Sequence, residues 1–254
     1  EYCLSKIEDK LKKDNSIAAF VMESGAQMAG GVIIYPKTFQ KKISQICKKN
    51  DVLFVLDEIA TGFGRLGSMA EYQSQNSIPD IVSFGKMLTG GYQTFAATLT
   101  TKKINDSFLG EFSEFKHLFH GHTYTGNPTA AALSLKNLEL YEKYHLIEKI
   151  QKTSKVFENR INDISTLDMV GEIRHKGMVM GIELVQNKKS NKPLSSKISM
   201  NKLVFEEGRK HQIYFRTLGN IIMLVPPLAI SQKDLNFLID GTISTIKSLS
   251  RKLR

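Results

Sequence analysis

Two residues, Asp57 and Lys86, stand where the sequence could place reactive groups. Asp57 follows the apolar run 52–56, and Lys86 follows the apolar run 81–84 and the single residue Gly85. An acidic residue at the carboxyl end of a buried strand lies where open α/β sheets bind their ligands. A lysine held at a dry strand end can serve as a nucleophilic amine. Taken alone, each residue has an ordinary alternative role. Asp57 could be a turn or N-cap aspartate, and Lys86 could be a solvent-exposed charge.

The elements that must position these residues alternate along the first half of the chain. Strands are expected at 18–22, 52–56, 81–84 and 95–99, and helices at 38–49 and 128–144. Apolar strands separated by helices are typical of a mainly parallel sheet covered on both faces. The fold class is therefore predicted to be α/β.

The pattern changes near residue 145. Strands are expected at 170–173, 178–185, 213–215 and 221–225, helices at 147–164, 197–210 and 233–249, and a polar loop at 186–196. Closely spaced strands followed by helices indicate a smaller α+β unit. We therefore expect a large domain at 1–145 and a small C-terminal domain at 146–254.

Composition narrows the class of protein. The 254 residues are 41% hydrophobic with a formal net charge of +10. The lysines form short, dispersed pairs such as Lys12–Lys13, which favours a solvated surface over nucleic-acid binding. Cys3 and Cys47 have neither metal-site nor disulfide spacing. With no long apolar stretch and no leader pattern, we expect a cytoplasmic protein that has no membrane span and no metal site.

Two motifs together resemble one known family. The segment 57–65, DEIATGFGR, and the segment 85–91, GKMLTGG, are similar to those of the class III, or ω-aminotransferase-like, enzymes. The resemblance extends from Phe20 to Pro227. It implies the fold-type I architecture of transferases that depend on pyridoxal 5'-phosphate, called pyridoxal phosphate below. It also implies that Asp57 contacts the pyridine nitrogen of this cofactor and that Lys86 is joined to the cofactor as a Schiff base. Lys86 would also be the catalytic residue, moving a proton beside the substrate.

Three further segments extend the resemblance. In 22–31, MESGAQMAGG, it makes Glu23 a residue that positions the cofactor or neutralises a substrate-binding arginine. In 120–128, HGHTYTGNP, it makes Thr123 a donor to the cofactor phosphate of a neighbouring subunit, which implies a homodimer, and Gly121 a substrate contact. In 214–219, YFRTLG, it makes Arg216 the residue that binds a substrate carboxylate.

Each of these assignments competes with a structural alternative. Glu23 could be a turn carboxylate, and Arg216 could belong to a structural ion pair. Thr125 or Asn127 could simply cap the helix that begins at Pro128. These alternatives stay open on the sequence alone.

Finer features favour one branch of the family. Ala60, the segment 85–91 and the segment 97–101 resemble members that aminate a keto acid in biotin biosynthesis by a ping-pong exchange, with S-adenosylmethionine or lysine as amino donor. Met223 occupies a position where better-known members carry an aromatic residue. The alternative is another class III enzyme acting on ornithine, 4-aminobutyrate or a similar ω-amine.

The resemblance also sets an expectation about the start of the chain. Enzymes of this family have a long portion before the segment that matches Phe20, which carries a Gly-Ser contact to the phosphate and an aromatic residue stacked on the pyridine ring. The sequence is therefore expected to be a piece of a longer protein, with the N-terminal part missing, that binds cofactor weakly on its own.

Overall fold

The computed structural model describes residues 1–195 and 197–253, and the chain divides into two compact units. The first contains Glu1–Gly25, Tyr35–Phe63 and Ser68–His145, and the second contains Ala26–Ile34, Gly64–Gly67 and Leu146–Arg254. The expected domains, 1–145 and 146–254, stay a prediction. The sequence pattern did not anticipate that 26–34 and 64–67 group with the second unit.

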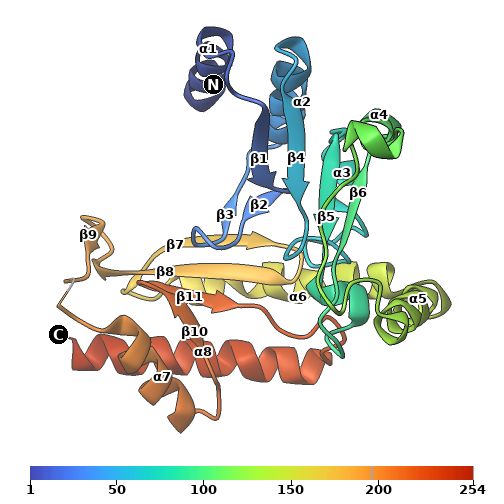
Figure 1. The fold of residues 1–254 in the computed structure, drawn as a ribbon. Helices are drawn as coiled ribbons and strands as arrows, with labels where there is room; N and C mark the ends of the chain where they lie inside the picture. The colour runs from blue at the N-terminus through green and yellow to red at the C-terminus, as the bar shows by residue number, and fades with distance from the viewer. Residues whose placement is uncertain (196, 254) are drawn as a thin grey trace. The chain divides into compact units, whose positions relative to one another are not determined.

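The first unit is built on a four-stranded sheet in the order β1-β4-β5-β6 (Figure 1). Its strands are β1 (Ala19–Glu23), β4 (Leu53–Asp57), β5 (Ile81–Phe84) and β6 (Ala97–Thr100). The first three run parallel, and β6 is antiparallel to β5. The prediction of a mainly parallel α/β sheet is confirmed.

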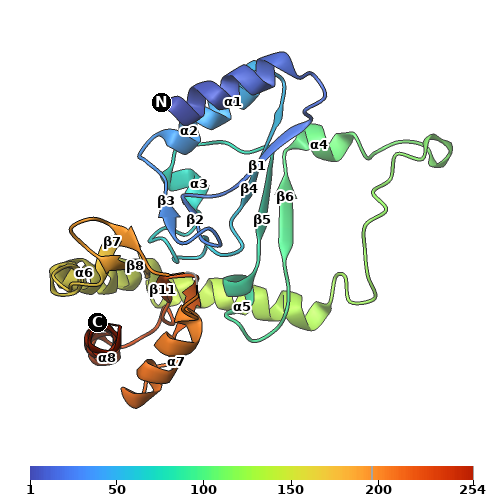
Figure 2. The same cartoon turned by 90° about the vertical axis from the view of Figure 1, so that its left-hand side faces the viewer.

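Both α-helices and 3-10 helices belong to the first unit. They are α1 (Tyr2–Lys13), α2 (Phe39–Lys49), α3 (Glu71–Ser74), α4 (Lys102–Asp106), α5 (Pro128–Lys143), and the 3-10 helices η1 (Lys86–Thr89) and η2 (Phe112–Glu114). In Figure 2, α1, α2 and α3 lie on the same side of this sheet. The helix α1 was not expected from the sequence.

Burial alternates along the central strands of this sheet. Phe54 and Leu56 of β4 are buried, whereas their neighbours along the strand are half-buried. Val21 of β1 is exposed, and it is in register with the half-buried Val55. One face is therefore packed and the other stays partly open within the described part of the chain, where the sequence pattern predicted cover on both faces.

The second unit is an antiparallel sheet with three long helices. The strands are β2 (Ala26–Gln27), β3 (Ile33–Ile34), β7 (Val170–Lys176), β8 (Val179–Asn187), β9 (Lys192–Pro193), β10 (Arg216–Leu218) and β11 (Ile221–Leu224), and the helices are α6 (Leu146–Ser165), α7 (Met200–Lys210) and α8 (Gln232–Lys252). The main path runs β10-β11-β8-β7, with β9 paired to β8 and β2 paired to β3. This is the α+β arrangement that the sequence predicted.

Arg65 explains why the short segment 64–67 belongs with this unit. Its buried guanidinium donates to the carbonyl oxygens of Met178 at 3.1 Å and Pro226 at 2.7 Å. Close packing adds to this, since a Cβ placed on Gly177 would lie 2.4 Å from the backbone carbon of Leu66. The glycine-rich motif that begins at Asp57 therefore ends as part of the second unit.

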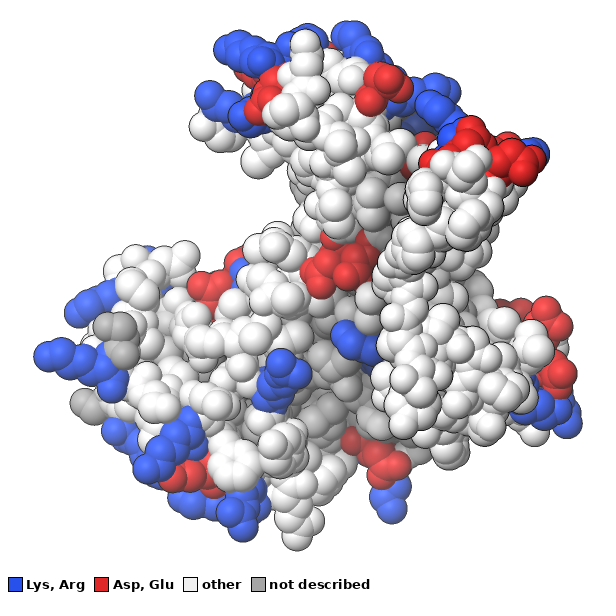
Figure 3. Space-filling model, viewed as in Figure 1, with Lys and Arg blue, Asp and Glu red and all other residues white. Residues whose placement is uncertain are grey.

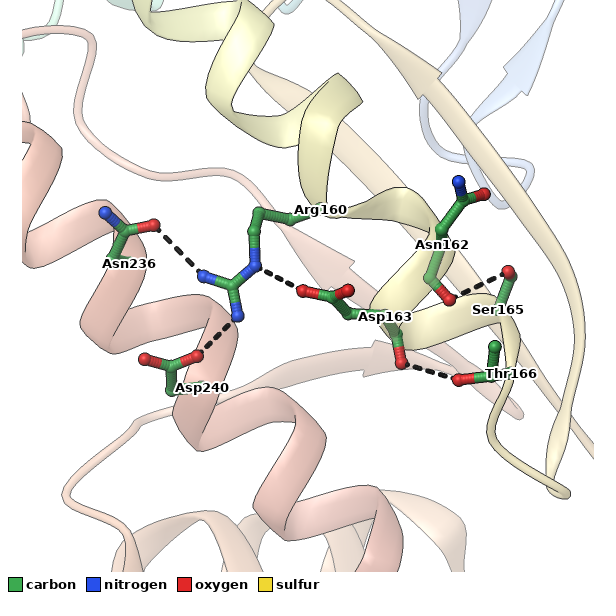
Figure 4. Close-up of polar contacts among 7 residues, drawn as sticks. All are labelled: Arg160, Asn162, Asp163, Ser165, Thr166, Asn236 and Asp240. Atoms are coloured by element: carbon green, nitrogen blue, oxygen red, sulfur yellow. Dashed lines mark hydrogen bonds and ion pairs between the residues drawn. The ribbon is translucent and has the colours of Figure 1, made fainter.

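Arg160 joins two helices of the second unit (Figure 4). Its guanidinium contacts Asp163 on the same helix, α6, and Asn236 and Asp240 on α8, at 2.5, 3.1 and 2.6 Å. One planar group thus satisfies three acceptors, a geometry to which arginine is suited.

Two local predictions in this unit were wrong. The expected strand at 213–215 is irregular, because the amide of Ile213 donates to the carbonyl of Gly208 at 2.9 Å and closes the end of α7. Strand pairing begins only at Arg216, opposite Met223. The expected loop 186–196 contains the short strand β9, while Ser196 lies outside the described residues.

No helix among residues 1–195 and 197–253 is both long and apolar enough to cross a membrane.

Candidate active site

Three of the predicted site residues lie at one edge of the first unit's sheet. Glu23 ends β1 and pairs with Asp57, which ends β4 and pairs in turn with Ser83 of β5. Lys86 follows β5 and opens η1. Register partners on adjacent parallel strands face the same side and lie about 4.8 Å apart. The structure therefore brings the carboxyl ends carrying Glu23, Asp57 and Lys86 together.

Asp57 is half-buried and takes part in a turn. Its Oδ1 accepts a hydrogen bond of 2.8 Å from the amide of Ile59. This bond is the turn role expected of an ordinary strand-end aspartate, and it holds the carboxylate in one orientation. A turn role and a ligand role are thus compatible, because a carboxylate has a second oxygen.

Glu58, the next residue, is fully buried and was not singled out from the sequence. Its carboxylate accepts backbone hydrogen bonds from Glu71 at 2.7 Å and Tyr72 at 2.5 Å. Burial raises the pKa of the Glu58 carboxyl, and the carboxylate of Glu71 raises it further, whereas the two backbone N–H donors oppose the shift. Glu58 thereby ties the strand end to the start of α3.

Gln40 holds the chain just after Glu23. Its buried side chain accepts from the amide of Gly25 at 2.7 Å and donates to the hydroxyls of Ser24 and Ser77 at 3.1 and 2.7 Å. Gly25 has a φ of +74°, and a Cβ there would lie 2.5 Å from Cγ of Glu71. Only glycine fits this turn, so the backbone beyond Glu23 is closely constrained.

Glu23 has an electrostatic neighbour. Burial raises the pKa of Tyr35 to about 12, and the carboxylate of Glu23 contributes to that shift. The half-buried Glu23 thus places negative charge near the strand edge occupied by Asp57. An amine or other cation bound there would be favoured.

Lys86 has an unusual backbone conformation. Its φ is +43°, in the left-handed region that non-glycine residues adopt rarely, and the turn that it begins ends at Gly90 with φ +62°. Such strain is often found at functional sites. The side chain is exposed rather than held in the dry environment expected from the sequence, because Lys86 starts a turn beyond the buried end of β5.

Thr123 and Gly121 are not part of the elements that carry Glu23, Asp57 and Lys86. They belong to the connection between α4 and α5, which Figure 2 shows as an extended loop, and both are exposed. Within the loop, Thr125 accepts from the amide of His122 at 2.9 Å, and Asn127 caps α5 by accepting from Ala130 at 3.0 Å. The capping alternative is therefore confirmed for Asn127, and the role of Thr123 stays a prediction.

Arg216 belongs to the second unit. It is exposed at the start of β10, beside a groove of about 760 Å³. Residues of α7 and of the segment 214–218 line this groove, among them Lys202 and the aromatic pair Phe205 and Tyr214, whose rings are 5.4 Å apart. Basic groups beside an apolar wall are suited to an aliphatic carboxylate.

Residues 1–246 match the sequence model of the class III aminotransferases. The chain belongs to this family. Among curated relatives, the adenosylmethionine-8-amino-7-oxononanoate aminotransferase of Aquifex aeolicus is 39% identical over 98% of this chain and 55% of its own length. That of Methanocaldococcus jannaschii is 41% identical over 96% of this chain and 54% of its own length. The chain thus spans about half the length of these class III relatives.

Solved structures of class III aminotransferases agree with the sequence match. The crystal structure of the Methanocaldococcus jannaschii enzyme superposes with a TM-score of 0.92 at 40% identity, covering 98% of this chain and 58% of that one. A Bacillus anthracis aminotransferase gives a TM-score of 0.89 at 31% identity, covering 97% of this chain and 56% of that one. The fold-type I architecture is confirmed.

Class III aminotransferases depend on pyridoxal phosphate, and the strand edge fits this group. Adjacent strand ends are separated by about the size of a six-membered ring. One end carries a carboxylate suited to a protonated ring nitrogen, and the next leads to a lysine amine suited to an aldehyde.

Proposed function

We propose that the complete protein is the aminotransferase of biotin biosynthesis that converts 7-keto-8-aminopelargonate into 7,8-diaminopelargonate. The observation that carries the proposal is the likeness to the Methanocaldococcus jannaschii enzyme, 40% identical with a TM-score of 0.92. It is supported by relatives of the same name from Geobacter sulfurreducens and Staphylococcus aureus, at 36% and 38% identity.

The cofactor-binding and catalytic roles are assigned to the strand edge. Pyridoxal phosphate, when bound, supplies an electron sink for the carbon that gains or loses a proton. Asp57 would favour a protonated ring nitrogen by electrostatic attraction, and Glu23 would contribute to positioning from the neighbouring strand. The amine of Lys86 would hold the cofactor. It would also accept and return a proton at the substrate carbon.

Arg216 is assigned to the carboxylate of the keto acid. A guanidinium stays charged and can bind a carboxylate through two parallel hydrogen bonds. The groove beside it offers Phe205 and Tyr214 as an apolar wall for the aliphatic chain. Gly121 remains a proposed substrate contact from the exposed loop of the first unit.

The complete protein is further proposed to be a homodimer, in which Thr123 donates to the cofactor phosphate of a second copy. The exposed loop around Thr123 supports this. It carries several large apolar side chains with much of their surface in solvent, among them Phe112 and Phe119, each 82% exposed. An exposed apolar group of this size is typical of an interface. Size-exclusion chromatography with light scattering on the complete protein tests the stoichiometry.

The amino donor is proposed to be S-adenosylmethionine or lysine. A reducing, cytoplasmic setting is proposed with it and is supported by the two free thiols, exposed Cys3 and buried Cys47.

The deciding experiment incubates the complete protein with pyridoxal phosphate, 7-keto-8-aminopelargonate and each donor in turn. Formation of 7,8-diaminopelargonate supports the assignment. The Lys86→Ala variant must abolish both turnover and the visible absorption band of the bound cofactor. The second candidate is another class III aminotransferase that acts on ornithine, 4-aminobutyrate or a similar ω-amine. It would replace the proposal if only such an amine served as donor and the amino group went to other acceptors. That candidate is favoured by the gamma aminobutyrate transaminase of Solanum lycopersicum, 33% identical over 92% of this chain.

A nucleic-acid role has less support than either enzyme. Figure 3 shows Lys and Arg side chains in separate groups, with Asp and Glu among them. Several lysines are paired with acids in the same helix, such as Lys12 with Glu8 and Lys136 with Glu139. On the face that Figure 3 shows, the basic side chains therefore form separate groups, despite the net charge of +10. Salt-sensitive DNA binding by a protein that shows no cofactor band would favour this role.

A further inference from the structure

The turn that carries Lys86 contains few hydrogen bonds of its own. Within and around η1, Leu88 donates to the carbonyl of Gly85 and Gly90 donates to the carbonyl of Met87, both at 3.0 Å. A four-residue 3-10 helix is a weak element by itself. The left-handed backbone of Lys86, at φ +43°, therefore depends on contacts from outside the turn.

Asn137 of α5 supplies such contacts. Its amide nitrogen donates to the carbonyl oxygens of Met87 at 2.7 Å and Leu88 at 3.2 Å, the two residues that directly follow Lys86. Its amide oxygen lies on the side of Gly90, where a Cβ would be only 3.2 Å away. A single half-buried side chain thus bonds the middle of the turn and fills the space beside its end.

The helix that carries Asn137 is itself firmly anchored. One turn further along α5, at the i+4 position on the same face, the hydroxyl of buried Tyr141 donates to the carbonyl of Phe63 at 2.7 Å. Phe63 lies in the glycine-rich segment that begins at Asp57. The same face of α5 therefore holds the turn bearing Lys86 and the turn that follows Asp57.

We propose that Asn137 is a positioning residue for Lys86: by fixing the carbonyls of Met87 and Leu88, it sets the backbone conformation from which the reactive amine extends. This inference rests on the proposed function, because that function makes the Lys86 amine the group that holds the cofactor. Leucine at position 137 would preserve the volume but remove both donors, and aspartate would preserve the shape but place an acceptor against two carbonyls.

The test uses the complete, cofactor-loaded protein with Asn137→Leu and Asn137→Asp, and with Lys136→Gln as the matched control. Lys136 is the exposed neighbour on α5 and pairs with Glu139 rather than with the turn. Both Asn137 variants are expected to shift the pH at which the visible band of the cofactor titrates. They should also lower kcat between roughly tenfold and a hundredfold, with little change in KM. Lys136→Gln should behave as wild type.

A second measurement needs no turnover. Pyridoxal phosphate is added to the cofactor-free protein, and the growth of the visible band reports how readily the Lys86 amine reacts. Both Asn137 variants should react more slowly than wild type at equal folded fraction, which circular dichroism of the cofactor-free protein monitors. If Asn137→Leu does not fold, the near-isosteric Asn137→Asp alone decides the outcome.

The positioning role is overturned if the band titrates at the wild-type pH in both variants, or if their losses match only a loss of folded protein. Failure of the underlying function is distinct. It would show as a wild-type protein without a cofactor band, or as a band that survives in Lys86→Ala.

Discussion

The backbone amide of Glu71 donates a hydrogen bond of 2.7 Å to Oε2 of Glu58, and both glutamates are fully buried. Each has further donors, Tyr72 for Glu58 and the side chains of Ser68 and Gln75 for Glu71. Burying two carboxylates together is costly unless such donors surround them. Glu58 directly follows Asp57 in the chain, so the charge state of this pair bears on the stability of the strand edge.

The first prediction concerns pH. Burial raises the pKa of the Glu58 carboxyl above its ordinary value of 4.5. At a pH between 4.5 and the raised pKa of the folded state, the folded protein binds a proton that the unfolded chain does not. The stability from this group is therefore fully present below the ordinary value and is lost as pH rises through the folded-state pKa, by at most about 1.4 kcal/mol per pH unit.

Glu58→Gln should remove that dependence. Urea unfolding measured upward from pH 4 is expected to show wild type losing stability relative to the variant as pH rises above the ordinary value. Glu206→Gln, an exposed carboxylate on α7, serves as the control and should give a constant difference. A constant difference for Glu58→Gln as well would contradict the prediction.

Asp57→Asn tests the electrostatic role at the cofactor nitrogen. Asparagine can still accept the hydrogen bond from the amide of Ile59, so the turn survives while the charge is lost. A neighbouring opposite charge shifts a pKa by about 1 to 3 units. We expect kcat of the complete protein to fall roughly tenfold to a thousandfold, with the thermal midpoint of the cofactor-free protein close to wild type. Retention of wild-type kcat would exclude the proposed role.

Tyr141→Phe should weaken the hold of α5 on the glycine-rich turn. The substitution keeps the ring contact with Phe63, at 6.3 Å between centroids, and removes the 2.7 Å hydrogen bond to its carbonyl. A buried acceptor left without this donor costs about 1 to 3 kcal/mol. Chemical denaturation should show a loss in that range, compared with almost none for Tyr2→Phe, whose side chain is exposed. An unchanged midpoint would show that water replaces the hydroxyl.

Arg160→Gln should destabilise the second unit in a salt-dependent way. Of the three contacts drawn in Figure 4, those with Asn236 and Asp240 join α6 to α8. The acids Asp163 and Asp240 have 49% and 63% of their side chains exposed. Partly exposed ion pairs contribute little, so we expect a loss of about 1 kcal/mol that shrinks at high ionic strength. Lys155→Gln, an exposed charge on the same helix, is the control. A loss that salt does not alter would assign the effect to packing.

The sequence predicted the parts of the site that depend on local pattern. Asp57 and Lys86 follow apolar runs, and a strand end is a local feature, so their positions at one sheet edge were predictable. Glu58, Gln40 and Asn137 were missed, because their importance depends on partners distant in the chain. The only local sign for Glu58 is its place in the motif beside Asp57.

Errors in the predicted fold have the same origin. The segment 213–215 has the alternating burial of a strand, with Ile213 and Phe215 buried and Tyr214 exposed. The backbone of Ile213 is nevertheless occupied in closing α7. Periodicity reports which side chains are buried, whereas strand formation requires a free backbone and a partner.

The positive φ of Lys86 bears on how this protein could be improved. Glycine would relieve the backbone at position 86, and a search for stabilising substitutions guided by conformational preference alone would select it. That choice would delete the reactive amine. The stability given up at this position is therefore inseparable from the chemistry, and engineering for heat resistance must seek its gains in other parts of the molecule.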